Sequence, residues 1–194
     1  MYIGLQYSYA NNTKLALDFL NDAAISSGEN ALVLHEQGCI HYMMKQWESA
    51  EEHFTRALKL AYGLTDADEV CDIMELLWKP ISQFWEPLLN NLGHTKRKLG
   101  KYLDAVKFHQ KAIVLRPQKA STIGAMAVAF ASAGRVDEAA IQFHNALSLS
   151  PHDQVGVCLS KLIPLTLFRL LSLKKCAECN FASNSIVNHW NVFK

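Results

Sequence analysis

Four polar residues in the middle of the chain follow one another at helical spacing and could recognise a peptide. They are Asn90, His94, Arg97 and Lys98. An asparagine amide can donate to a backbone C=O and accept from a backbone N–H of an extended segment. The three basic residues add donors for acidic groups or for a chain terminus. The chemistry that this pattern predicts is noncovalent binding of polypeptide.

Residues that could support catalysis or metal binding are sparse. Cys176 and Cys179 form a single CxxC pair with only His189 nearby, whereas a structural zinc site needs four ligands. Three other histidines fall near equivalent points of successive segments, but their positions in the repeat differ by one each, so a core or surface role is expected. They are His53, His109 and His144. Nucleophile elbows, phosphate loops and HExxH motifs are missing. We expect no enzyme activity, no cofactor and no metal.

The elements that must position these residues are predicted by a 34-residue period in the small residues and prolines. The matching pairs are Gly4/Gly38, Ala16/Ala50, Ala23/Ala57, Ala105/Ala139, Ala112/Ala146 and Pro117/Pro151. This is the period of the tetratricopeptide repeat (TPR), in which each unit is a pair of antiparallel helices. We therefore expect an all-α TPR solenoid, a right-handed superhelix of such pairs. An unrelated helical bundle with chance alanine spacing is the alternative.

Residue types within the units agree with this fold. The positions expected to be structural are Gly38, Ala50, Phe54, Ala57, Gly93, Ala105, Ala112, Pro117, Ala139, Phe143, Ala146 and Pro151. The small residue of the first helix lets the second helix approach, and the large residue between the two alanines fills the space that they leave. The proline ends the second helix, and Gly100 and Gly134 fall in the turn inside the hairpin. Since one unit cannot bury its apolar face alone, stacking of the units makes the core.

The first helix of each TPR unit is expected to line a concave groove. Counting the second, fifth, ninth, twelfth and thirteenth positions of these helices selects candidate groove residues. The strongest of them are His35, Tyr42, Asn90, His94, Arg97 and Lys98. A solvated charged face is the alternative for the basic residues.

Four segments follow from the period and its interruptions. Residues 1–62 hold two units, the first truncated at its start, and residues 86–153 hold two more. An insert or linker of residues 63–85 separates them, in which Val70 to Trp78 could be a short helix that docks a partner or, as we prefer, packs back on the array. Residues 154–194 form a divergent tail that could be a partial cap. Because an array rarely begins with an uncovered half-helix, we expect a fragment or variant form.

Composition excludes several classes of protein. Half of the residues are hydrophobic, 19% are charged and the net charge is +1, which favours a folded chain without the electrostatic footprint of a nucleic-acid binder. Five cysteines, three of them scattered through helix-like segments, favour a reducing compartment over a disulfide framework. The longest apolar stretch, Leu162 to Leu173, is interrupted and too short to span a bilayer.

Several runs of sequence resemble one family of TPR subunits of the anaphase-promoting complex, the cell-division-cycle "sixteen" family. These runs are WEPLLNNLGH at 85–94, RKL at 97–99, KY at 101–102, MYIGL at 1–5, NN at 11–12, KLA at 14–16 and PQKAST at 117–122. The resemblance implies a non-catalytic scaffold of a ubiquitin ligase that acts in mitosis, in nucleus and cytoplasm. It implies other TPR subunits and a small accessory subunit held in the groove as partners. Dimerisation is not expected, because the repeats that dimerise in the family are not in this sequence. A free-standing TPR adaptor that binds short acidic peptide tails, as co-chaperones do, is the alternative function.

Overall fold

The structure is a computed structural model that describes residues 2–10, 12–28, 30–64 and 72–150. The CxxC pair, His189, Pro151 and the expected tail lie outside these residues. Two separate bodies make up the chain, residues 1–115 and residues 116–194. Within the described residues the secondary structure is entirely helical, and no helix is both long and apolar enough to cross a membrane.

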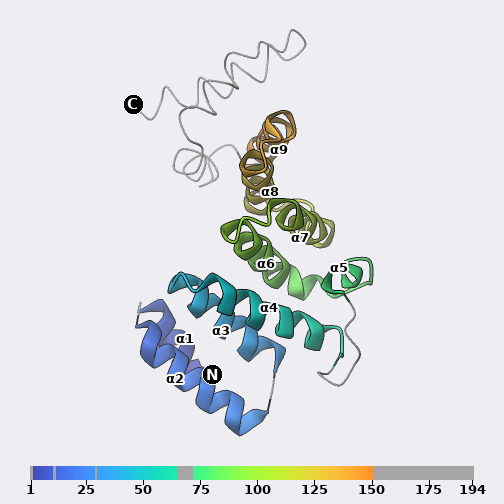
Figure 1. The fold of residues 1–194 in the computed structure, drawn as a ribbon. Coiled ribbons are helices and arrows are strands. Elements are labelled where there is room, and N and C mark those ends of the chain that lie inside the picture. The colour runs from blue at the N-terminus through green and yellow to red at the C-terminus, as the bar shows by residue number, and fades with distance from the viewer. Residues whose placement is uncertain (1, 11, 29, 65–71, 151–194) are drawn as a thin grey trace. The chain divides into compact units, whose positions relative to one another are not determined.

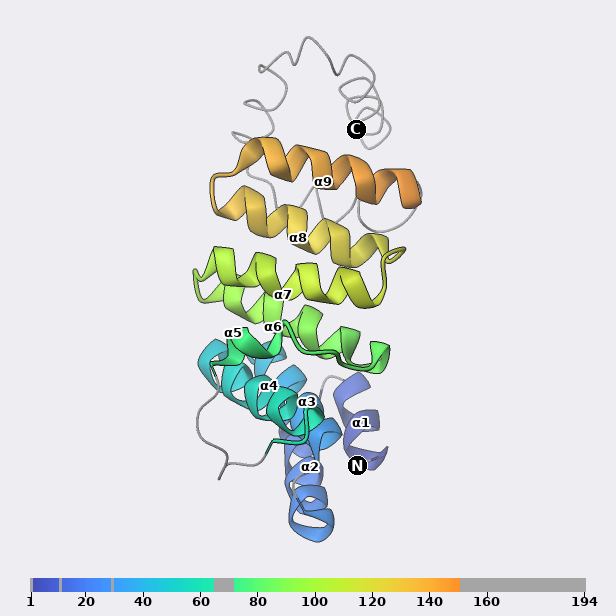
Figure 2. The same cartoon turned by 90° about the vertical axis from the view of Figure 1, so that its right-hand side faces the viewer.

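The helices pair in sequence order, as the TPR period predicts. In the first body these pairs are α1 (Tyr2–Tyr9) with α2 (Thr13–Ser27), α3 (Ala31–Met43) with α4 (Trp47–Ala61), and α6 (Glu86–Lys98) with α7 (Tyr102–Leu115). Helix α3 packs on α2 and α6 packs on α4, so the pairs stack (Figure 1). The second body contains the pair α8 (Ala120–Ser132) and α9 (Val136–Leu149), which run side by side in Figure 2.

In each of the two central helix pairs, an aromatic ring of the second helix packs directly over a glycine of the first helix. An added Cβ at Gly38 of α3 would lie 2.6 Å from the Phe54 ring of α4, and one at Gly93 of α6 would lie 2.5 Å from the His109 ring of α7. Both rings are fully buried. Glycine is therefore required at these positions for close approach of the two helices, rather than for an unusual backbone conformation.

The two central pairs share one apolar core. Its fully or nearly fully buried members come from α3, α4, α6 and α7, and they are Leu34, Ala50, Phe54, Ala57, Leu58, Leu88, Leu89, Leu92, Phe108 and Ala112. A smaller cluster, made by Ala16, Leu20, Val33 and Ile40, joins α2 to α3. Burial of these side chains removes apolar surface that no single helix pair could cover, which is why the pairs stack.

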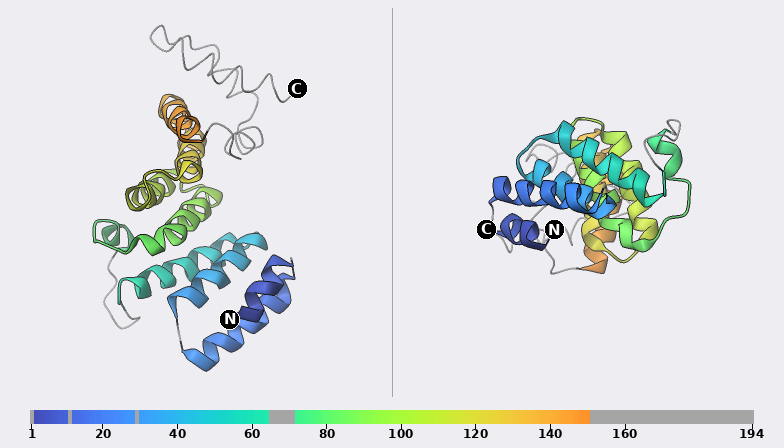
Figure 3. Two further views of the ribbon diagram at one scale, coloured as in Figure 1. Left: turned by 180° about the vertical axis from the view of Figure 1, so that it is seen from behind. Right: turned by 90° about the horizontal axis from the view of Figure 1, so that it is seen from below.

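The insert packs back on the array, as preferred from the sequence. Its short helix α5 (Ile73–Leu76) buries Leu76 completely, and Ile73, Met74 and Leu77 pack against the central core. The 3-10 turn η1 (Gln83–Trp85) then leads into α6, and Figure 3 shows α5 beside the α4–α6 stack from behind. Trp78 does not join this packing and is 89% exposed.

Three of the turns inside the helix pairs use a left-handed residue. Gly100 and Gly134 stand there with φ values of +78° and +77°. Lys45 occupies the same point of the α3–α4 turn with φ of 62°, a conformation that costs a non-glycine residue about 1–2 kcal/mol. The hairpin turns predicted at Gly100 and Gly134 are thus confirmed, and the structure has an equivalent turn at Lys45.

Candidate functional site

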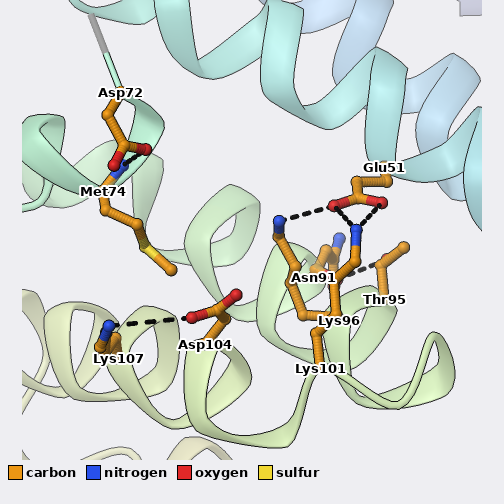
Figure 4. A network of polar contacts seen from close by, with 9 residues as sticks. All are labelled: Glu51, Asp72, Met74, Asn91, Thr95, Lys96, Lys101, Asp104 and Lys107. Atoms are coloured by element: carbon orange, nitrogen blue, oxygen red, sulfur yellow. Dashed lines mark hydrogen bonds and ion pairs between the residues drawn. The ribbon is translucent and has the colours of Figure 1, made fainter.

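An ion-pair network fixes the stacking of α6 on α4, and thereby the position of the candidate face. The Glu51 carboxylate of α4 accepts hydrogen bonds from two ammonium groups, as Figure 4 shows. Its Oε1 lies 2.6 Å from Lys96 Nζ and 3.0 Å from Lys101 Nζ. The Lys96 side chain is only 10% exposed and its Nζ lies 5.8 Å from the centre of the Phe108 ring. Burial alone would raise the pKa of Glu51, but hydrogen bonds and charges from the two lysines outweigh it and hold that pKa below its ordinary value of 4.5.

A second polar contact joins the first helices of neighbouring pairs, α3 and α6. Asn91 Nδ2 donates to His35 Nε2 at 3.1 Å and to Cys39 Sγ at 3.4 Å. His35 in turn shares its Nδ1 proton with Glu36 Oε1 at 3.1 Å, which leaves Nε2 as the acceptor. On the same helix, Thr95 Oγ1 donates to the Asn91 carbonyl one turn earlier, as Figure 4 also shows. The two Asn91 bonds thus join α6 to α3, while the Thr95 bond lies within α6.

The donor atoms of His35, Glu36 and Cys39 lie within 4.8 Å of one another, a spacing that a metal ion could bridge. Burial, assisted by the charge of Glu36, raises the pKa of the Cys39 thiol to about 12, although the Asn91 hydrogen bond opposes this rise. A metal would have to remove that thiol proton and displace Asn91, since the thiolate is the ligating form. The group is better described as a hydrogen-bond network between two helices.

The predicted residues of α6 surround a buried histidine of α7. His109 donates from Nδ1 to Asn90 Oδ1 at 2.8 Å, and the ring of His94 meets it edge-on at a centroid separation of 5.1 Å. Burial, followed by the neighbouring charges of His94 and Arg97, holds the pKa of His109 well below 6.5, so the ring is neutral. With the proton on Nδ1, the lone pair on Nε2 is buried and has no hydrogen-bond partner within the described residues.

Asn90 therefore differs from its predicted role in one respect. The sequence suggested an amide that both donates to and accepts from a bound peptide, but its oxygen is already used by His109. Asn90 is half-buried, whereas His109 is fully buried, so the accessible edge of the amide is Nδ2. Because Oδ1 is turned toward the buried ring, the amide offers its Nδ2 donor on the accessible side.

Arg97 of α6 and Tyr42 of α3 are a further pair of predicted residues that influence each other. Burial raises the pKa of the half-buried Tyr42 hydroxyl, and the positive charge of Arg97 opposes the rise, which places the two residues near each other. The Nε–H of Arg97 is buried and meets no acceptor in the part of the protein that the structure describes. A buried donor without a partner is costly, so this N–H is a cost that the packing of α6 bears.

Lys98 is placed differently from the other predicted residues. It is exposed, and its ammonium group lies 5.5 Å from the centre of the Trp47 ring at the start of α4. Trp47 also meets Tyr42 edge-on at 4.9 Å. A cation over an aromatic face is attracted to the ring quadrupole, so Lys98 of α6 packs on Trp47 of α4.

Of the six predicted residues, five are linked by contacts or charge: Asn90, His94 and Arg97 act on His109, Tyr42 feels the charge of Arg97, and His35 bonds to Asn91 of α6. We call this set the α3–α6 face. Sequence reasoning missed His109 and Asn91, which bond to Asn90 and His35, and it missed Glu51, which pairs with Lys96. A signal for His109 was present, because it is a polar residue where two other units carry Phe54 and Phe143. Glu51 and Asn91 gave no such signal, since each looks like an ordinary solvated helix residue.

Comparisons with known proteins agree with the helix pairs. Family models of the tetratricopeptide repeat match residues 31–63 and 88–116. The cell division cycle protein 16 homolog of Homo sapiens is 38% identical over 157 residues, which is 81% of this chain and 23% of the human protein. Anaphase-promoting complex subunit 6 of Arabidopsis thaliana is 30% identical over 155 residues, 79% of this chain and 25% of that protein. The chain therefore spans about a quarter of the length of these relatives.

A solved structure shares the fold. The crystal structure of the APC/C hetero-tetramer Cut9–Hcn1 superposes with a TM-score of 0.69 at 22% identity, over 84% of this chain and 29% of the other. At that identity the superposition supports the arrangement of helices, and the matches to the human and plant sequences carry the relationship.

Proposed function

Because the chain is a TPR protein homologous to the CDC16/APC6 subunits of the anaphase-promoting complex, we propose that it is a non-catalytic scaffold in that ubiquitin ligase. The observation that carries the proposal is the 38% identity to the human protein over 81% of the sequence. The two TPR matches fall on the central helix pairs, which build the α3–α6 face. In this role the protein supports assembly of a complex that acts in cell-cycle control, in nucleus and cytoplasm.

The α3–α6 face is the surface that we assign to partner binding. It offers donors from two half-buried residues, Asn90 and Arg97, on a helix that Glu51 and Asn91 join to its neighbours. An extended segment of another subunit suits such a face, because its carbonyl and carboxylate oxygens would satisfy these donors. The Cut9 structure pairs a TPR protein with the partner Hcn1, which makes an Hcn1-like accessory subunit the occupant that we propose.

A second function is favoured by one observation, the half-buried Arg97 of α6, whose positive charge acts on Tyr42 of α3. A free-standing adaptor would use this guanidinium to bind the terminal carboxylate of a short peptide tail. Comparing free-acid and amidated forms of one peptide separates this function from the scaffold, because only tail capture depends on the terminal charge.

The proposal is tested by mixing the purified 194-residue protein with recombinant Hcn1 and, separately, with other TPR subunits of the complex. We expect a stable complex by size-exclusion chromatography and calorimetry, weakened by Arg97→Ala. The matched control is Arg135→Ala, which removes an exposed arginine of the second body. Failure of the unaltered protein to bind any of these subunits would count against the scaffold function.

A further inference from the structure

His109 is an exception to the packing pattern of the helix pairs. The equivalent positions in the α3–α4 and α8–α9 pairs hold Phe54 and Phe143, both buried. His109 has the same place over a small residue, with its ring atoms 2.5–2.7 Å from where a Cβ of Gly93 would stand. A phenylalanine would fill this space with no polar atoms to satisfy. Packing alone therefore does not explain a histidine at this position.

The histidine has a cost that the phenylalanines do not have. Its Nε2 is buried without a hydrogen-bond partner among the described residues, and neutral imidazole is the form that this burial enforces. What the polar ring adds is one hydrogen bond, from Nδ1 to Asn90 Oδ1 at 2.8 Å. That bond joins a fully buried ring on α7 to a half-buried amide on α6, and it decides which end of the amide faces outward.

We propose that His109 is a positioning residue that fixes the Asn90 amide with Nδ2 outward, so that Asn90 reads a backbone carbonyl of an extended partner segment. The inference rests on the proposed function and adds the chemistry of recognition at one position. A carbonyl oxygen satisfies Nδ2, whereas a backbone N–H at the same point would leave two donors facing each other. The neighbouring Arg97 is also a donor, so the segment must present oxygens along this stretch of the face.

The orientation of the amide is tested first on the unaltered protein by NMR, without any partner. We expect the ¹⁵N and ¹H signals of the His109 ring to report a proton on Nδ1, and the Asn90 side-chain amide signals to shift in His109→Phe. A proton on Nε2 would mean that the amide is reversed and presents its oxygen outward, which would overturn the proposal whatever the protein binds.

Recognition is then tested with recombinant Hcn1 as the probe, by calorimetry on the full 194-residue protein. We expect His109→Phe to leave the melting temperature unchanged or raised and to weaken binding by about tenfold, the loss of one well-placed hydrogen bond. In an Asn90→Ala background the same substitution should have no further effect, because the residue acts only through Asn90. Asn90→Asp, which keeps the shape but has no N–H, should weaken binding as much as Asn90→Ala.

The matched control is His144→Phe, which makes the same change at an exposed position of α9 and should leave binding unaltered. Binding of Hcn1 by His109→Phe at wild-type strength would refute the positioning role while leaving the scaffold function intact. If the unaltered protein does not bind Hcn1, the proposed partner is refuted, and with it carbonyl recognition of Hcn1. The NMR result would then decide by itself how the Asn90 amide is oriented.

Discussion

Replacing Gly38 by alanine tests whether close helix approach is what holds each pair together. The added Cβ would lie 2.6, 2.7 and 3.1 Å from three ring carbons of Phe54, and contacts below 3.0 Å are essentially never tolerated. The ring is fully buried in the central core, so it cannot swing into solvent. The two helices must therefore separate, or the surrounding residues must repack.

Two opposing effects set the change in the free energy of unfolding caused by Gly38→Ala. Alanine is favoured over glycine in a helix interior by about 1 kcal/mol, which would stabilise the variant. Overpacking a filled core costs about 1–3 kcal/mol, and a rigid aromatic ring places this site near the upper end. We expect a net loss of about 1–2 kcal/mol, seen in urea unfolding followed by helical circular dichroism as a midpoint lowered by about 0.5–1 M.

A relief variant makes the test specific. In the Phe54→Leu background the smaller residue should accept the Cβ, so Gly38→Ala should there cost less than it does alone, a coupling that a double-mutant cycle measures. An increase in stability on Gly38→Ala alone would show that helix propensity dominates and that the glycine is not required for close approach.

Three further predictions concern charge, backbone and thiol. Glu51→Gln should destabilise the protein by about 2 kcal/mol, because it leaves the buried ammonium group of Lys96 without its anion, whereas Glu138→Gln at an exposed pair should have no measurable effect. Since the pKa of Glu51 lies below 4.5 in the folded state, its contribution is present above about pH 4.5 and is lost as pH falls through that lowered pKa, so the stability difference between wild type and Glu51→Gln should vanish in acid. Lys45→Gly should stabilise the α3–α4 turn by about 1 kcal/mol in thermal unfolding, and a loss would contradict the left-handed assignment. Alkylation of Cys39 at pH 8, followed on its own peptide by mass spectrometry, should be slow until the protein is unfolded, and rapid labelling of the native protein would contradict its raised pKa.

The fold was predictable because its determinants repeat. Small residues at a 34-residue period impose the same close approach in each pair, and the structure buries Ala50, Ala57, Ala105 and Ala112 completely. The position of the insert followed from the break in that period. Its packing against the central core followed from the apolar residues of α5.

The site was predicted only in part, because repeat position tells which face a residue occupies and not which neighbour it meets. Counting along the first helices selected Asn90 and Arg97 as candidates, and the structure places both close to His109. The count could not show that His109, on the second helix, would take the Asn90 oxygen. Nor could it show that Glu51 would pair with Lys96, since both contacts depend on how neighbouring helices are set against each other.

The central claim, assembly into the anaphase-promoting complex through the α3–α6 face, is tested most directly by affinity purification of the tagged protein from dividing cells, with mass spectrometry of what accompanies it. The Asn90→Ala/His94→Ala variant and the exposed control His144→Phe would be purified in parallel. We predict that other subunits of the complex accompany the unaltered protein and the control, and that the double variant recovers less of the accessory subunit. The account would be contradicted if chaperones were recovered in place of those subunits. It would also be contradicted if the double variant recovered as much of the accessory subunit as the unaltered protein does.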